Sequence, residues 1–142
     1  MIVISANPDL DRVKALLAAS QLPIEDLTAA HCRDFFFTGP PDAPTGLVGL
    51  EVLGNVALLR SLVVAPAGRN TGAGTTLVRH AEDHARSRHV RDLYLLTTTA
   101  EAFFTKRGYL CTPRETAPAA IKATREFAGI CPASSAFMTK HL

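Results

Sequence analysis

The sequence predicts a single α/β domain in which strands and helices are mixed along the chain. Two apolar runs joined by Gly54-Asn55 are typical of a β-hairpin, and the later part of the chain alternates between strand-like and helix-like segments. No repeat, low-complexity tract or linker interrupts the 142 residues, so we expect one domain over residues 1–142. A domain of this length buries roughly 70% of the surface that its unfolded chain exposes, which allows a core without disulfides or metal.

The composition argues against several classes of protein. With 47% hydrophobic and 20% charged residues the chain is typical of soluble globular proteins, and its net charge of +2 gives no support for a nucleic-acid or membrane partner. No apolar run approaches the roughly 20 residues of a membrane-spanning helix, and Met1–Ala6 lacks the features of a signal peptide. The oligomeric state, monomer or homodimer, stays open.

The cysteines and histidines predict neither a disulfide frame nor a metal site. The three cysteines, Cys32, Cys111 and Cys131, are odd in number and contain no C-x-x-C pair, which favours a reducing cytoplasm. The segment His80–His84 departs from the H-E-x-x-H order of zinc enzymes, and a helix with a polar side explains it better.

The first third of the chain predicts two strands and two helices, because β-rich runs and helical spacing of apolar residues alternate there. In order, we expect a strand at Ile2–Ile4, a helix from Leu10 to near Pro23, a short helix at Glu25–Ala30, a strand at Phe35–Phe37 and a loop at Gly39–Pro44.

The sequence of the remaining residues predicts a hairpin, then a long helix, and then alternating strands and helices. The hairpin strands are Leu47–Leu53 and Val56–Val64, and apolar residues recur on one helical face from about Gly72 to Arg88. The later elements are a strand at Leu93–Thr97, a helix at Ala100–Lys106, a strand at Tyr109–Thr112, a helix at Ala117–Phe127 and a strand at Ala136–Lys140.

The segment from Leu62 to Gly74 carries the clearest chemical signal. An apolar strand runs into a Gly-rich turn, which opens the long helix. The first N–H groups of a helix have no partner within it and lie at the positive end of its dipole, so they can hold an anion. Gly72 and Gly74 remove side chains where a phosphate must come close, and Arg69 adds a positive charge. The segment therefore predicts a phosphate or pyrophosphate site.

Two common nucleotide motifs do not fit this segment. A Walker A loop requires Gly-Lys-Ser/Thr, whereas Gly74 is followed by Thr75 and Thr76. The dinucleotide pattern G-x-G-x-x-G/A fails at Leu77, and Asp92 precedes the next predicted strand instead of ending it.

The segment instead resembles the GNAT acyltransferases. Its R-x-x-G-x-G pattern follows an apolar strand ending Val-x-Pro, like the family's CoA pyrophosphate loop, and Thr99–Tyr109 is similar to the family's A-x-x-F-Y-x-K-x-G-F segment. The order and spacing agree over roughly Gly46–Leu110. The resemblance implies an acyl-CoA N-acyltransferase fold, with a mixed, mostly antiparallel sheet flanked by helices. It also implies acetyl-CoA as co-substrate for N-acetylation of a small-molecule amine acceptor.

The resemblance further implies which residues contact acetyl-CoA. The main chain of Leu62–Val64 would pair with the pantetheine arm like an added strand, and the loop from Arg69 to Gly74 would hold the pyrophosphate. Phe104 stands where many members have a tyrosine that protonates the leaving thiolate, so the thiolate would leave unaided or with water. The full set is Leu62, Val63, Val64, Arg69, Asn70, Thr71, Gly72, Ala73, Gly74, Thr75 and Phe104.

A narrower resemblance, to the arsenic-resistance-associated N-acetyltransferase branch, covers most of the chain. It rests on Ala57–Leu62, Leu95–Ala100 and the C-terminal Ala117–Ile121 through Cys131-Pro132. It implies a detoxifying enzyme whose acceptor is an amino acid or an arsenic- or phosphinate-containing analogue. Two other functions stay open: acetylation of a protein or peptide, and a CoA-binding sensor that has lost catalysis.

Glu51 is the candidate catalytic base, acting directly or through water. It lies among apolar residues on a hairpin strand expected to border the acceptor, where burial favours proton uptake by a carboxylate. A solvent-exposed carboxylate on the same strand is the alternative. Glu101 is a weaker candidate, because its position at a predicted helix start already explains it.

Arg60 and Arg114 are the candidate substrate-binding residues for an anionic group on the acceptor. Arg60 precedes Leu62 by one strand period, which predicts that both side chains share a face. An arginine offers paired donors to a carboxylate or a tetrahedral oxyanion. A surface or ion-pair role is the alternative for Arg60, and Lys122 and Arg125 are weaker candidates on a helix face expected to be solvated.

Overall fold

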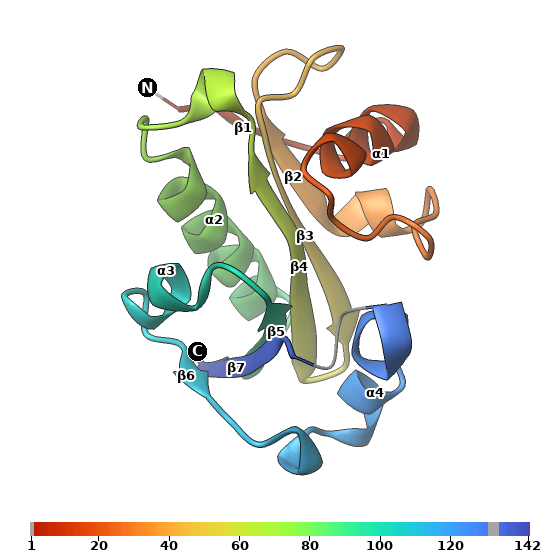
Figure 1. Ribbon diagram of the computed structural model, residues 1–142, viewed down its shortest axis with the longest axis vertical. Helices are drawn as coiled ribbons and strands as arrows, with labels where there is room; N and C mark the ends of the chain where they lie inside the picture. The colour runs from red at the N-terminus through yellow and green to blue at the C-terminus, as the bar shows by residue number, and fades with distance from the viewer. Residues whose placement is uncertain (1, 131–133) are drawn as a thin grey trace.

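A seven-stranded sheet in the order β1-β2-β3-β4-β5-β7-β6 runs through the computed structural model, which describes residues 2–130 and 134–142. Neighbouring strands are antiparallel except for β4 and β5, which are parallel. The strands are β1 (Ile4–Ala6), β2 (Phe35–Thr38), β3 (Gly46–Leu53), β4 (Val56–Val64), β5 (Asp92–Thr97), β6 (Leu110–Cys111) and β7 (Ala136–His141). The mixed, mostly antiparallel sheet flanked by helices is therefore confirmed (Figure 1).

Helices cover both faces of this sheet. On one face lie α2 (Ala73–Ser87) and the short α3 (Glu101–Thr105), and on the other lie α1 (Leu10–Ala19) and α4 (Ala119–Lys122) (Figure 1). Short helical turns join them: the 3-10 turns η1 (His31–Asp34), η2 (Pro66–Gly68) and η3 (Arg114–Thr116), and the π turn η4 (Glu126–Ile130). Within residues 2–130 and 134–142, no helix combines the length and apolar character needed to cross a membrane.

Successive side chains of β4 enter cores on opposite faces of the sheet. Ala57 and Leu59 belong to the core beneath α2, whereas Val56 and Leu58 pack with the residues of α4. This period of two, with both faces covered, explains why the strand is a continuous apolar run in the sequence.

The alternation changes phase at a β-bulge in β4. Between the cross-strand pairs Gly49–Arg60 and Leu47–Val63, β4 holds two residues where β3 holds one. The first of the two, Ser61, has a φ of 60°, a left-handed conformation that non-glycine residues rarely adopt. The bulge lies in the middle of the sheet, beside the point where β4 and β5 separate.

The bulge overturns one prediction about side-chain direction. Leu62 packs against the core beneath α2, whereas the guanidinium of Arg60 lies on the opposite face, against Glu126 of η4. The predicted shared face of Arg60 and Leu62 is therefore wrong, because a strand period of two does not continue across a bulge.

Two predicted elements near the N-terminus lie elsewhere. The strand expected at Ile2–Ile4 begins only at Ile4, because its pairing with β2 starts there. The short helix expected at Glu25–Ala30 is not formed; the helical turn of this region is η1, which follows it directly.

The helix predicted at Ala117–Phe127 is divided into α4 and η4. The hydroxyl of Thr124 donates to the carbonyl of Ile121 at 2.7 Å and accepts from the N–H of Phe127 at 3.3 Å. A threonine that bonds the main chain in this way ends one turn and caps the next. The end of the narrower resemblance, Cys131-Pro132, lies outside the described residues.

Candidate active site

The strands β4 and β5 separate and leave one edge of β4 open. Their parallel pairing is limited to the register from Val56↔Asp92 to Leu58↔Tyr94. Within the described residues, Leu59–Val64 therefore have no strand partner on the side of β5 (Figure 1). An open strand edge presents unpaired N–H and C=O groups, so an extended ligand can bind there as an added strand.

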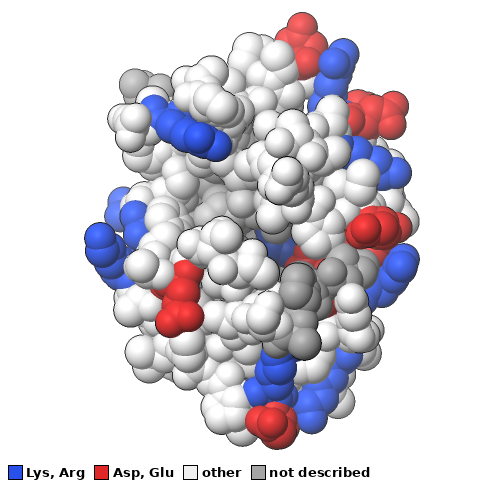
Figure 2. Space-filling view, in the orientation of Figure 1, with Lys and Arg blue, Asp and Glu red and all other residues white. Residues whose placement is uncertain are grey.

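A cleft follows this open edge and has two parts. The β4–β5 channel, of about 120 Å³, lies between the separated strands and is lined by Leu62, Leu96 and Phe104 among others. The Glu126 pocket, of about 350 Å³, extends from the bulge at Ser61 to Glu126. Because Arg60 and Ser61 line both parts, the bulge lies at their junction. Figure 2 shows a hollow in the middle of this face, with basic and acidic atoms at its floor.

The open edge of β4 leads to the N-terminus of α2. Gly72 caps this helix with a φ of 79° and no side-chain cap is present, so the first N–H groups, from Ala73 onward, are free for an anion. A Cβ at Gly72 would meet nothing within 4 Å, which leaves the approach to the helix open. The Nε of Arg69 donates to the carbonyl of Val64 at 3.3 Å, which holds this cation between strand and helix.

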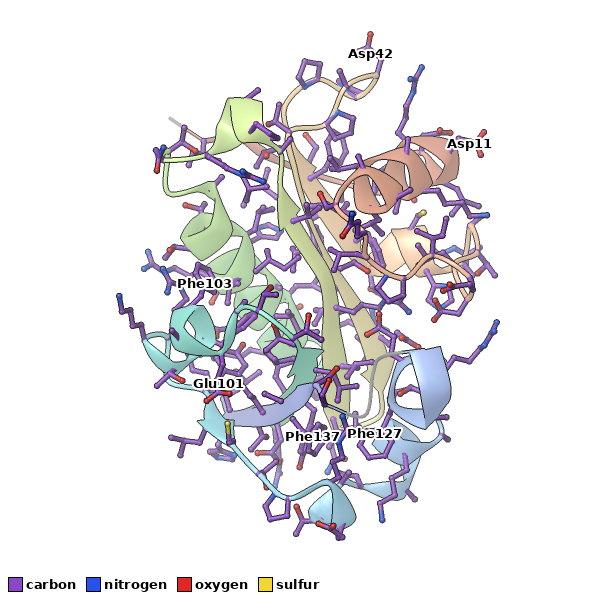
Figure 3. The ribbon with its side chains drawn as sticks, in the orientation of Figure 1. Asp11, Asp42, Glu101, Phe103, Phe127 and Phe137 are labelled. Carbon is purple, nitrogen blue, oxygen red and sulfur yellow. The ribbon has the colours of Figure 1, made fainter. Side chains whose placement is uncertain are left out.

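Gly74 has a packing role that the sequence did not indicate. A Cβ at this position would lie 3.3 Å from the ring of Phe103, which points from α3 toward α2 (Figure 3). Gly74 is predicted to let a phosphate come close; it also lets α2 and α3 pack closely together. A larger residue at Gly74 would disturb the packing of α3 as well as any ligand.

Arg107 is a residue near the helix start that the sequence analysis missed. Its guanidinium stacks on the Phe103 ring at 3.6 Å, and its Nε donates to the hydroxyl of Thr75 at 3.2 Å. Thr75, expected to bind the pyrophosphate, is therefore already a hydrogen-bond partner of an arginine. The signal was present in the sequence, since Arg107 lies within the segment that resembles the family.

The floor of the Glu126 pocket is an ion cluster centred on Arg60. Its guanidinium is fully buried and lies within ion-pair distance of three carboxylates, contributed by Asp26, Glu51 and Glu126. The separations are 2.9 Å to Asp26 Oδ1, 3.0 Å to Glu51 Oε2 and 3.1 Å to Glu126 Oε1. Arg60 thus lines the cleft, but its charge is engaged by three carboxylates of the protein itself.

The pKa values of two carboxylates in this cluster, Asp26 and Glu126, are shifted in opposite directions. Burial alone would raise the pKa of Asp26, but its hydrogen bonds and ion pair with Arg60 lower the pKa overall. Burial, together with the charges of Asp26 and Glu51, raises the pKa of Glu126 to about 7 despite the charge of Arg60. One guanidinium cannot compensate three carboxylates, so Glu126 is the member that takes up a proton near neutral pH.

Glu51 contacts Arg60 but is not among the residues that line the Glu126 pocket. Its Oε2 accepts from Arg60, and its Oε1 lies 3.8 Å from His31. Asp26, His31 and Glu51 hold ligand-type atoms within 4.8 Å of one another. We do not assign them as metal ligands, because both carboxylates already accept hydrogen bonds from Arg60.

Arg114 and Phe104 occupy different parts of the structure. Arg114 does not line the Glu126 pocket; it donates to the carbonyl of Ser135 at 3.1 Å and faces the Phe127 ring, which Figure 3 places beside Phe137. Phe104 is buried at the channel wall. Neither Tyr94 nor Tyr109, the two tyrosines of the chain, lines the cleft, so no phenol replaces the one missing at Phe104.

Comparisons with known proteins agree with this geometry. Residues 12–109 match the model of the acetyltransferase (GNAT) family. An amino-acid acetyltransferase of Ralstonia nicotianae is 40% identical over 55 residues, which are 39% of this chain and 12% of that protein.

Solved structures share the fold over the whole chain. N-acetylglutamate synthase from Neisseria gonorrhoeae, complexed with coenzyme A and N-acetyl-glutamate, superposes with a TM-score of 0.83 at 18% identity, over 100% of this chain and 35% of that one. A GNAT-family acetyltransferase from Staphylococcus aureus superposes with a TM-score of 0.80 at 16% identity, over 100% and 99% of the two chains. The chain thus spans about a third of the synthase and an eighth of the Ralstonia relative.

The family match covers the hairpin, the open edge of β4, the start of α2 and the α3 segment, although Glu126 and Ser135 of the Glu126 pocket lie beyond the matched residues. The chain therefore belongs to the GNAT acetyltransferase family.

Proposed function

We propose that the protein transfers the acetyl group of acetyl-CoA to the nitrogen of a small amino compound. The observation that carries this proposal is the open edge of β4, which leads directly to the uncapped N-terminus of α2. An extended pantetheine arm can pair with the main chain of Leu62–Val64, while the helix start receives a diphosphate. The neighbours solved with coenzyme A support the same co-substrate.

The residues proposed to hold acetyl-CoA form a continuous path. Leu62, Val63 and Val64 supply main-chain groups, Phe104 lines the channel, and the loop of Arg69, Asn70, Thr71, Gly72, Ala73, Gly74 and Thr75 surrounds the phosphate position. Arg107 adds a second cation at Thr75. Positive charge and free N–H groups are thus concentrated where the diphosphate would lie.

The Glu126 pocket supports a small acceptor. Its volume of about 350 Å³ suits an amino acid or a short amine better than a folded protein tail, so peptide acetylation is the less favoured alternative. An amino-acid acceptor is supported by the Ralstonia relative and by the synthase bound to N-acetyl-glutamate. The arsenic- or phosphinate-containing analogues implied by the narrower resemblance belong to this same class.

A second acceptor class is favoured by the charge of the pocket. An anionic acceptor would need a cation, and Arg60 is the proposed partner at the pocket; Arg114, the other arginine predicted from the sequence, does not line it. Arg60, however, is shared among three carboxylates, so the cluster carries surplus negative charge. A cationic amine without a carboxylate would be attracted to such a surplus.

A carboxylate of the Arg60 cluster is proposed to receive the amine proton, and Glu51 is the member predicted from the sequence. Main-chain N–H groups on the edge of β4 that has no partner in β5 are proposed to stabilise the thioester oxygen. With no phenol in the cleft, the thiolate leaves unaided or takes a proton from water. A cytoplasmic site of action suits the free thiols of Cys32 and Cys111.

An acceptor screen that follows release of free CoA thiol tests this function. The panel includes neutral and anionic amino acids, phosphinate analogues, polyamines and a peptide with a free N-terminus, each against a reaction without acceptor. Thiol release that depends on one of the small amines supports the proposal. CoA binding without release from any amine would instead favour the catalytically silent sensor.

A further inference from the structure

Glu126 reaches the cleft from a part of the chain far from the hairpin. It begins η4, 75 positions after Glu51, and lines the same pocket as Ser61 of the bulge. Its side chain is 5% exposed, and within the described residues its only ion-pair partner is Arg60, which contacts Oε1. The pocket therefore brings a buried carboxylate next to the junction with the β4–β5 channel.

The groups that face Glu126 come from three elements. Arg60 of β4 attracts its charge, whereas Glu51 of β3 and Asp26 of the segment between α1 and η1 repel it. Burial acts in the same direction as the two carboxylates and has the largest effect on the pKa. A carboxylate that takes up a proton near neutral pH is suited to proton transfer from an amine.

A second group in the same pocket lacks a partner. The hydroxyl of Ser135 is buried, and within the described residues it has no hydrogen-bond partner. Leaving a buried hydroxyl without a hydrogen-bond partner costs on the order of 1–3 kcal/mol of folding free energy, so such groups usually bind a ligand or water. Ser135 lines the pocket together with Glu126, and a bound polar acceptor would satisfy it.

We propose that Glu126 is the catalytic base that takes the proton from the acceptor's ammonium group, in a subsite that it forms with Ser135. The proposal rests on the acetyl-transfer function proposed above and names the member of the Arg60 cluster that faces the acceptor. Glu51, held between Arg60 and His31, orients Arg60 and is a positioning residue.

The chemistry balances with acetyl-CoA as the acyl donor. An ammonium proton moves to a carboxylate oxygen of Glu126, and the neutral amine forms a C–N bond to the thioester carbonyl carbon. The C–S bond breaks, its electron pair goes to sulfur, and the second proton shed by nitrogen converts the thiolate to CoA thiol. Glu126 then releases its proton to solvent, so an ammonium ion and acetyl-CoA give an amide, CoA thiol and one proton.

Glutamine substitutions at two positions test the assignment. In Glu126→Gln, we expect kcat/KM for the best acceptor of the screen to fall roughly 10²- to 10⁴-fold at neutral pH. The wild-type profile should rise with an apparent pKa of about 7, and this step should vanish in the variant. Activity should partly return at high pH, where free amine is abundant. In Glu51→Gln the loss should be smaller, and the step should remain but move to lower pH, because the charge of Glu51 helps to raise the pKa of Glu126.

The controls separate this proposal from the function on which it rests. Far-UV circular dichroism and CoA affinity should match wild type in both variants. If Glu126→Gln does not fold, Glu126→Asp takes its place and should keep activity with a displaced step in the pH profile. A wild-type-like profile in the substituted Glu126 enzyme, or loss of the step in Glu51→Gln alone, would overturn the assignment. No thiol release from wild type would overturn the proposed function instead.

Discussion

Nη2 of Arg60 lies 3.1 Å from Oε1 of Glu126 and joins the central strand β4 to the C-terminal turn η4. The same guanidinium also holds Asp26 and Glu51, so one buried cation connects three segments that are distant in the sequence. Each of these carboxylates relies on that one charge.

Arg60→Ala is expected to lower the free energy of unfolding by about 3–5 kcal/mol, because it leaves buried carboxylates without their counter-ion. The surface pair Arg86–Asp83 supplies a control, since its arginine side chain is 48% exposed. Arg86→Ala should cost about 1 kcal/mol or less. Urea denaturation at neutral pH measures both, and equal small losses would mean that the cluster does not stabilise the fold.

Stability should decrease as the pH rises from about 5 to about 7. The pKa of Glu126 is raised from its ordinary value to about 7, so in this window the folded state holds a proton that the unfolded state has released. Glu126→Gln removes this group and should flatten the slope, whereas Glu25→Gln in the same pocket should not. Denaturation curves across the window measure the slope, and an unchanged slope in Glu126→Gln would contradict the assigned pKa.

The segment proposed to bind the diphosphate could be predicted from the sequence because its parts are local. A strand, a turn with glycine at a left-handed position and a helix start are adjacent along the chain, and Gly72 indeed has a φ of 79°. The element order and most boundaries followed from apolar periodicity for the same reason.

The acceptor side could not be predicted in the same way. After the bulge at Ser61, each side chain of β4 lies on the face of the sheet opposite to the one that simple alternation predicts, and no local sequence pattern indicates the bulge. Glu126 contacts Arg60, and Ser135 lines the same pocket, only through tertiary packing, which the spacing of residues in a single sequence does not encode. Glu51, the base predicted from the sequence, contacts Arg60 but does not line the pocket.

Substitutions at Ser61 test whether acetyl transfer requires the bulge at the junction of the β4–β5 channel and the Glu126 pocket. Ser61→Gly accommodates the φ of 60° and should change stability by less than about 1 kcal/mol, although the hydrogen bond from Arg60 Nε is lost. Ser61→Val resists this conformation and should cost about 1–3 kcal/mol. Thiol-release rates should follow the same order. If valine were tolerated as well as glycine in both assays, the bulge would not be a requirement.

Arg69→Gln is expected to weaken CoA binding on the order of tenfold, because it removes a charge-assisted donor from the helix start. Arg107→Gln should act in the same direction through Thr75. Arg91→Gln, just before the far end of β5, is the matched control and should leave the affinity unchanged. Titrations at two salt concentrations should show that the losses shrink as ionic strength rises.

Calorimetric titration with CoA is the decisive test of the proposed site, because the open edge of β4 and the start of α2 are both proposed to bind this one ligand. We expect a saturable heat for one site, with about 2.7 kcal/mol of added stability at 100 times the dissociation constant. We also expect a clear loss of affinity in Arg69→Gln and none in Arg91→Gln. No heat at millimolar CoA, or equal binding in both variants, would contradict the assignment of this cleft.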